Sequence, residues 1–192
     1  PCLMASITAY GVSLLFQLPP TRFAILEGFA LSPLGILRVV ALAVLCALVS
    51  IVFCVSMHKT EKLLQRRLPN AYLRILLGSA VLIALTLLCG TNYSGAGTDM
   101  IVRAMGGAAE PWDWLLKIIF TAVTIGCGFK GGEIIPSFFI GATFGCFMGS
   151  LLGIPASFGA AIGLVAVFCG AVNCPIAAII LGVELFGARE LS

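Results

Sequence analysis

The chain has 192 residues, of which 60% are hydrophobic and only 10% are charged, and its mean hydropathy is +1.14. A soluble domain of this length carries about 25% charged residues. The composition therefore excludes a soluble globular domain and indicates a polytopic, all-α membrane protein whose solvent is the lipid bilayer. The net charge of +3 does not indicate a nucleic-acid-binding protein, because five of the 11 lysines and arginines lie in one short stretch, residues 59–74.

The first half of the chain contains three apolar segments. Residues 3–18 form the first, and a connecting stretch at residues 21–34 follows the two prolines that end it. Ile36–Met57 is a full-length span, and its helix is expected to continue through basic residues to Arg67. Residues 71–89 form the next span; at about 1.5 Å rise per residue, both spans reach across a hydrocarbon core of about 30 Å. Because basic short loops stay in the cytoplasm, the basic stretch predicts the cytoplasmic side.

The apolar segments of the second half are interrupted by glycine and proline. A short helix is expected at residues 98–105, with Thr98 as its N-cap, and a further span at residues 111–126. Three interrupted segments follow, at residues 133–152, 158–171 and 175–187. The last is too short to cross a bilayer, and Asn173 is expected to be its N-cap. Broken helices of this kind mark binding sites in membrane transporters.

Glycines recur every four residues in the first of these interrupted segments. The repeat comprises Gly141, Gly145, Gly149 and Gly153, and the interval returns at Gly159 and Gly163. Four-residue spacing places small residues on one helix face, where another backbone can approach closely. The spacing predicts tight helix packing rather than a direct role for these glycines in binding a substrate.

The residue inventory argues against an enzyme and against a metal or cofactor site. The eight cysteines form no C-x-x-C pair and lie mostly in apolar runs, which indicates buried free thiols rather than disulfides or metal ligands. With one histidine and no converging carboxylates, the chain offers no catalytic pair. Residues 1–192 are expected to be a single transmembrane domain. Because the chain begins at Pro1 without a signal peptide, it is expected to be a piece of a longer protein, cut at both ends.

Residues 126–131 match the pattern G-x-G-x-x-G of dinucleotide-binding proteins. That fingerprint requires a preceding strand, a βαβ unit and an acidic residue about 20 positions further on. Here an apolar helical span precedes the glycines, and no such acidic residue follows. The match is therefore accidental, and the glycines are interpreted as a flexible turn before the next helix.

A candidate anion site lies at the start of that next helix, at Gly132, Glu133, Ile134 and Ile135. Pro136 fits the first turn of a helix because its missing N–H would be unpaired there in any case. The helix therefore begins with free N–H groups and about half a positive charge, which together form a ready anion site. In a lipid-shielded interior such donors are costly to leave unpaired, and an anion satisfies them.

Glu133 is the candidate proton-coupling residue. The helix dipole favours its carboxylate, whereas burial and a neighbouring anion favour the neutral acid. A protonated Glu133 would donate a hydrogen bond to the anion and so couple anion occupancy to proton uptake. The alternative is a structural cap, in which the carboxylate itself accepts from the helix N–H groups. An ionisable residue beside interrupted helices in a membrane favours the functional interpretation.

Lys130 is interpreted as a snorkelling residue or as a cation that attracts anions, and Glu184 as a structural residue bonded to its surroundings.

These segments resemble the CLC family of anion channels and transporters. Residues 131–141, which read GGEIIPSFFIG, are similar to that family's G-x-F-x-P motif at the start of a membrane helix. Residues 173–184, which read NCPIAAIILGVE, are similar to its later short helix of R-A-P-L…L-E-M type. The resemblance covers nearly the whole chain and implies a CLC-type fold with broken, re-entrant helices. The chain would form the later half of an inverted repeat.

The glutamate narrows the resemblance to the fluoride/proton antiporter branch. Chloride members carry an apolar residue at the position of Glu133, and the antiporter branch often has threonine where Ile135 stands. The resemblance implies fluoride export coupled to protons across the cell (inner) membrane. The alternative is a chloride-selective CLC transporter or a voltage-gated chloride channel. The resemblance to the CLC family also implies a homodimer formed through residues 3–18 and 175–187. The family's serine loop, gating glutamate and pore tyrosine lie outside this chain.

Overall fold

The computed structural model describes residues 2–16 and 32–186, and all regular elements in these ranges are helices. This confirms the predicted all-α class. In chain order the elements are α1 (Cys2–Leu15), α2 (Pro33–Arg67), α3 (Ala71–Cys89), the 3₁₀ turn η1 (Thr91–Tyr93), α4 (Thr98–Met105), α5 (Asp113–Gly126), α6 (Ile134–Leu151), α7 (Ala156–Val172) and α8 (Pro175–Phe186).

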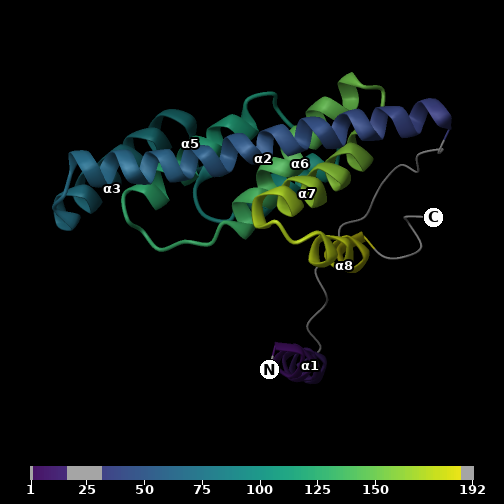
Figure 1. Cartoon of the computed structure of the whole chain (residues 1–192), viewed down its shortest axis with the longest axis horizontal. Coiled ribbons are helices and arrows are strands. Elements are labelled where there is room, and N and C mark those ends of the chain that lie inside the picture. Colours follow the sequence, from purple (N-terminus) through teal and green to yellow (C-terminus); the bar gives the residue numbers. More distant parts are fainter. Residues whose placement is uncertain (1, 17–31, 187–192) are drawn as a thin grey trace.

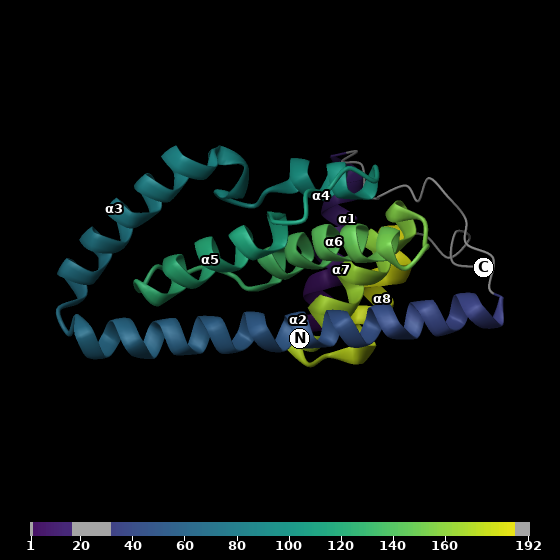
Figure 2. The ribbon, with the colours of Figure 1, turned by 90° about the horizontal axis from the view of Figure 1, so that it is seen from above.

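The long second helix is the spine of the structure. It begins at Pro33, where the Ser32 hydroxyl accepts a hydrogen bond from the Gly35 N–H, and it continues to Arg67 as predicted. Figure 1 shows α2 along the whole length of the helical body, and Figure 2 shows α5 and α6 between it and the α3–α4 side. Helix α1 lies apart from this body (Figure 1). The predicted ends of the first segment, residues 17 and 18, and most of the 21–34 stretch lie outside the described residues.

Two predicted helix caps were wrong. Gly97, not Thr98, is the N-cap of α4; its φ of +69° lies in the left-handed region, and Thr98 is the first helical residue. Asn173 does not begin α8 but ends α7, with a φ of +55° and its N–H donated to the Cys169 carbonyl. Asparagine tolerates the left-handed conformation that ends many helices, so this residue suits a C-cap as well as an N-cap.

Three of the described helices are long and apolar enough to cross a membrane: α2, α3 and α6. Most of helix α3 is exposed, and Gly78 is its one buried residue. Large apolar side chains cover its surface, including Leu87 at 82% and Leu88 at 83% exposure. A surface of this kind is unfavourable in water and suits contact with lipid or with further apolar helices. The described helices therefore belong to a multi-pass membrane protein.

Three glycines of the predicted repeat, Gly141, Gly145 and Gly149, pack α6 against α7, whereas Gly153 lies beyond the end of α6 with a φ of +71° and approaches Arg38 instead. A Cβ added to Gly141 would meet the backbone of Gly163, and one added to Gly145 would meet the backbone of Gly159. A Cβ on Gly149 would lie 3.0 Å from the Gly159 Cα. The two backbones therefore touch without intervening side chains. Because α6 carries the candidate anion site at its start, this contact fixes the helix that presents the site.

The α6–α7 contact predicts a large effect of a small substitution. Replacing Gly145 with Ala in the protein that contains this chain should lower its stability by about 1–3 kcal/mol, because the added methyl group has no space beside Gly159. Thermal unfolding of the purified protein in detergent measures this effect. A melting temperature equal to that of the wild type would contradict the proposed packing role.

Candidate functional site

The start of α6 has the free donors that the sequence predicts. Glu133 occupies the N-cap position, and the first N–H bonded in helical fashion is that of Ser137, which donates to the Glu133 carbonyl at 3.1 Å. Pro136 has no N–H. Within the described part of the chain, the N–H groups of Ile134 and Ile135 donate no hydrogen bond. The helix therefore presents a small cluster of unpaired donors at its positive end.

The four predicted site residues are consecutive and exposed in this chain. Ile134 and Ile135 are 48% and 45% exposed, and Gly132 and Glu133 are exposed as well. The Glu133 side chain forms no cap hydrogen bond with the helix. The structure thus contradicts the alternative in which this carboxylate satisfies the N–H groups at the start of α6. The carboxyl group is free to interact with something else at this helix end.

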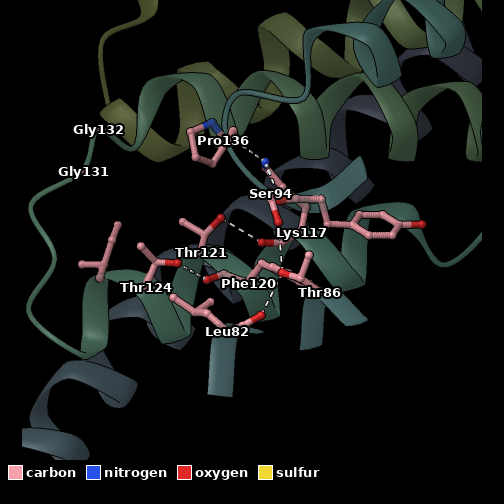
Figure 3. Close-up of a pocket in the computed structure, with 13 residues that line it drawn as sticks. Leu82, Thr86, Ser94, Lys117, Phe120, Thr121, Thr124, Gly131, Gly132 and Pro136 are labelled. Carbon is pink, nitrogen blue, oxygen red and sulfur yellow. Dashed lines mark hydrogen bonds between the residues drawn. The ribbon is translucent and has the colours of Figure 1, made fainter. Parts of the chain in front are cut away.

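A cavity of about 250 Å³ adjoins this helix start. Its walls come from α3, the loop after α3, α5 and the beginning of α6, and Figure 3 shows its labelled residues. The lining residues are Leu82, Thr86, Tyr93, Ser94, Gly95, Lys117, Phe120, Thr121, Thr124, Ile125, Gly131, Gly132 and Pro136. Gly132 is therefore both a predicted site residue and part of the cavity wall. Glu133, Ile134 and Ile135 do not line the cavity, but they lie in sequence between two residues that do, Gly132 and Pro136.

Lys117 is a buried cation on the cavity wall. Only 2% of its side chain is exposed, and it projects from the first half of α5. Its ammonium group donates to the carbonyl oxygens of Tyr93 at 3.1 Å and Gly95 at 2.7 Å. It also lies 4.8 Å from the centre of the Phe139 ring, within the range of a cation–π interaction. These contacts join α5, the loop after α3 and α6 around one charge.

Asp113 and Tyr93 complete this buried cluster. Tyr93 donates its hydroxyl to one carboxylate oxygen of Asp113 at 2.6 Å, and the Glu110 N–H donates to the other at 2.9 Å. Burial raises the pKa of the Tyr93 phenol well above its usual value, and the hydrogen bond and charge of Asp113 raise it further. Tyr93 is therefore a fixed, neutral donor. It holds the loop after α3 against the start of α5.

Sequence patterns missed this cluster for an identifiable reason. Hydropathy predicts a plain membrane span at residues 111–126, although Lys117 and Asp113 are ionisable residues inside it. That placement alone signals a functional or paired group. The contacts of both residues with Tyr93, which lies 20 positions before Asp113 and 24 before Lys117, depend on the tertiary fold and leave no local pattern.

The two other charged residues considered from the sequence, Lys130 and Glu184, lie on the surface of the described chain. Lys130 and Glu184 are exposed and form no hydrogen bond or ion pair with the described residues, so the predicted structural bond of Glu184 is wrong for this part of the chain. Within the same residues, no group of three histidine, cysteine, aspartate or glutamate side chains is arranged to hold a metal ion.

Comparisons with known proteins agree with this architecture. A protein-family model described as voltage gated chloride channel matches residues 1–192. A chloride/fluoride channel protein of Pseudomonas syringae pv. tomato is 36% identical over 194 residues, which cover 97% of this chain and 43% of that protein. An uncharacterized protein of Methanocaldococcus jannaschii is 35% identical over 71 residues, which cover 37% of this chain and 18% of that protein.

The fold has a close counterpart among solved structures. The crystal structure of a CLC-type fluoride/proton antiporter superposes with a TM-score of 0.92 at 32% identity, over 98% of this chain and 48% of that one. The chain thus spans about half the length of the antiporter and of the Pseudomonas relative that it matches. Family members are channels and transporters rather than enzymes. On sequence and fold together, this chain belongs to the voltage-gated chloride channel (CLC) family.

Proposed function

We propose that the protein containing this chain is a fluoride/proton antiporter that exports fluoride across the cell membrane. The observation that carries this proposal is the start of α6. There the Glu133 side chain does not cap the helix and lies beside the unpaired N–H groups of Ile134 and Ile135. The similarity to a CLC-type fluoride/proton antiporter and to a chloride/fluoride channel protein supports fluoride as the substrate. Residues 1–192 would form one transmembrane domain, the later half of the transport core.

The chemistry of this site suits a small, strongly hydrated anion. Water leaves fluoride only if strong donors replace it, and hydrogen bonds to a charged partner are about twice as strong as neutral ones. The backbone N–H groups of Ile134 and Ile135 supply two such donors without a counter-charge. A protonated Glu133 supplies a third, because the neutral acid has an O–H to donate. Anion binding then favours protonation of Glu133, and the two ions become coupled at one helix end.

Replacing Glu133 with Gln tests the coupling. The amide keeps the size of the side chain and can still donate a hydrogen bond, but it cannot release a proton. Fluoride-driven proton movement by the full-length protein in proteoliposomes should be lost, because the variant has no proton to exchange at this helix end. Glu61→Gln on α2 is the matched control, since it makes the same chemical change at a residue outside the site, whose carboxylate accepts a hydrogen bond from Gln65. Wild-type coupling in the Glu133 variant would sink the proposal.

A chloride-selective transporter or channel is the second candidate. The description of the matching family names chloride, and the name of the Pseudomonas relative includes both chloride and fluoride. In addition, Ile135 has no hydroxyl group to offer to the anion. Anion flux from proteoliposomes separates the two candidates, because strong donors around a protonated acid should favour fluoride. We expect the initial rate for fluoride to exceed that for chloride at equal gradients. A faster chloride rate would establish the second candidate instead.

We further propose a homodimer formed through residues 3–18 and 175–187, of which residues 17, 18 and 187 lie outside the described part. Helices α1 and α8 support this proposal by their exposed apolar side chains. On α8, Ile176 and Ile180 lie one turn apart and are 74% and 61% exposed.

A charge on this face tests the dimer. Ile180→Lys should convert the dimer to a monomer, because a buried, unpaired ammonium is strongly unfavourable at an apolar interface. Light scattering of the detergent-solubilised protein measures the mass, with Ile180→Val as the uncharged control. An unchanged mass in the lysine variant would place the interface elsewhere.

A further inference from the structure

The cavity beside α6 contains a buried charge that the proposed site does not use. Lys117 is 2% exposed, and its polar partners are two backbone carbonyls. Asp113, four residues earlier, is also buried, but its oxygens accept from Tyr93 and from the Glu110 N–H instead. In the part of the chain that the structure describes, Lys117 forms no ion pair. A buried cation without a carboxylate partner leaves positive potential on the cavity wall.

The geometry also leaves donor capacity for a ligand. An ammonium group has three N–H donors, and two of the three on Lys117 are used by Tyr93 and Gly95. The threonine hydroxyls on the wall are occupied differently, since Thr121 donates to the Lys117 carbonyl and Thr124 to the Phe120 carbonyl. Lys117 is therefore the charged donor of this cavity, and the hydroxyl oxygens around it are acceptors suited to water.

The size of the cavity decides in what form an anion would enter it. About 250 Å³ is far more than one bare halide requires, whereas a water molecule occupies about 30 Å³ of the liquid. An anion in this space keeps several water molecules, which the threonine oxygens can hold by accepting their hydrogen bonds. Gly131, Gly132 and Pro136 form part of the same wall, so the cavity opens against the start of α6 (Figure 3).

We propose that this cavity is a second anion site, in which Lys117 holds a partly hydrated small anion next to the helix start that receives it dehydrated. This inference rests on the proposed anion transport and adds a staging position to it. Binding in two steps divides the dehydration of the anion: the cavity supplies charge while the water shell is still present, and the α6 donors replace the remaining water. The cavity thus sets the apparent affinity for the anion rather than the coupling to protons.

Introducing a negative charge into the cavity tests this proposal while leaving Lys117 in place. Thr124 lines the cavity and is half-buried, so Glu and Gln at this position differ mainly in charge. In the full-length protein in proteoliposomes at neutral pH, Thr124→Glu should raise the KM for fluoride at least about tenfold relative to Thr124→Gln, because its carboxylate adds a negative charge to the cavity that offsets the Lys117 charge and repels the anion. The number of protons moved per fluoride should stay the same in both variants. Equal KM values for the pair overturn the proposal.

Removal of the cation provides the second arm. Lys117→Met should raise the KM by about tenfold or more, as expected for the loss of a charged donor, whereas Lys117→Arg keeps the charge and should retain most of the affinity. Lys62→Met on α2 removes one exposed positive charge from the chain and should change nothing. Gel filtration identifies any variant that fails to fold, and the Thr124 pair then decides alone. Equal KM values for the Met and Arg variants would also overturn the proposal.

Titration calorimetry with sodium fluoride separates this inference from the proposed function. If the wild type binds fluoride, the Thr124→Glu variant binds it more weakly than Thr124→Gln, and no fluoride–proton exchange occurs, the cavity proposal stands while the antiporter proposal fails. If exchange occurs and the Thr124 pair shares one KM and one dissociation constant, the cavity proposal fails alone.

Discussion

The first residues of α6 impose the central constraint on this structure: backbone donors that no other backbone group can satisfy. A helix that begins after an irregular stretch of a membrane protein leaves its first N–H groups without helical partners. At Ile134 and Ile135 these donors have no partner within the described residues, and the Glu133 side chain does not cap them. An anion is the partner that both the donors and the helix dipole favour. The surrounding helices hold this unfavourable backbone in place.

Two sets of contacts fix α6 in that position. Behind the site, glycines on α6 and α7 bring the two backbones into direct contact, so α6 cannot slide or rotate without a clash. Beside the site, Phe139 is fully buried between the Tyr93 ring and the Lys117 ammonium. A Cβ on Gly97 would lie 2.7 Å from the Phe139 ring, so the loop before α4 is also packed on this side chain. One aromatic residue thus ties the loop after α3 to the helix that carries the site.

Local chemistry determines which parts of this arrangement can be predicted from sequence. The spans, the interrupted helices and the glycine contact follow from hydropathy and spacing, and the α6 donors follow from glycines and a proline around Glu133. The cap assignments failed at Thr98 and Asn173, because a neighbouring glycine or a left-handed asparagine also satisfies a helix end. The Lys117 cluster could not be predicted, because its partners Tyr93 and Gly95 approach it only through the packing of α3, α5 and α6.

The positive charges around the cavity bear on the protonation state that the proposed mechanism assigns to Glu133. Lys117 and the start of α6 are both positive, and the Asp113 carboxylate forms its hydrogen bonds with Tyr93 and the Glu110 N–H rather than with Lys117. A permanently ionised Glu133 would compensate them and exclude the anion. A neutral Glu133 leaves the compensation to the anion itself. In the exchange proposed above, Glu133 takes up a proton when the anion arrives, while Lys117 contributes to the affinity for the anion and not to the number of protons moved.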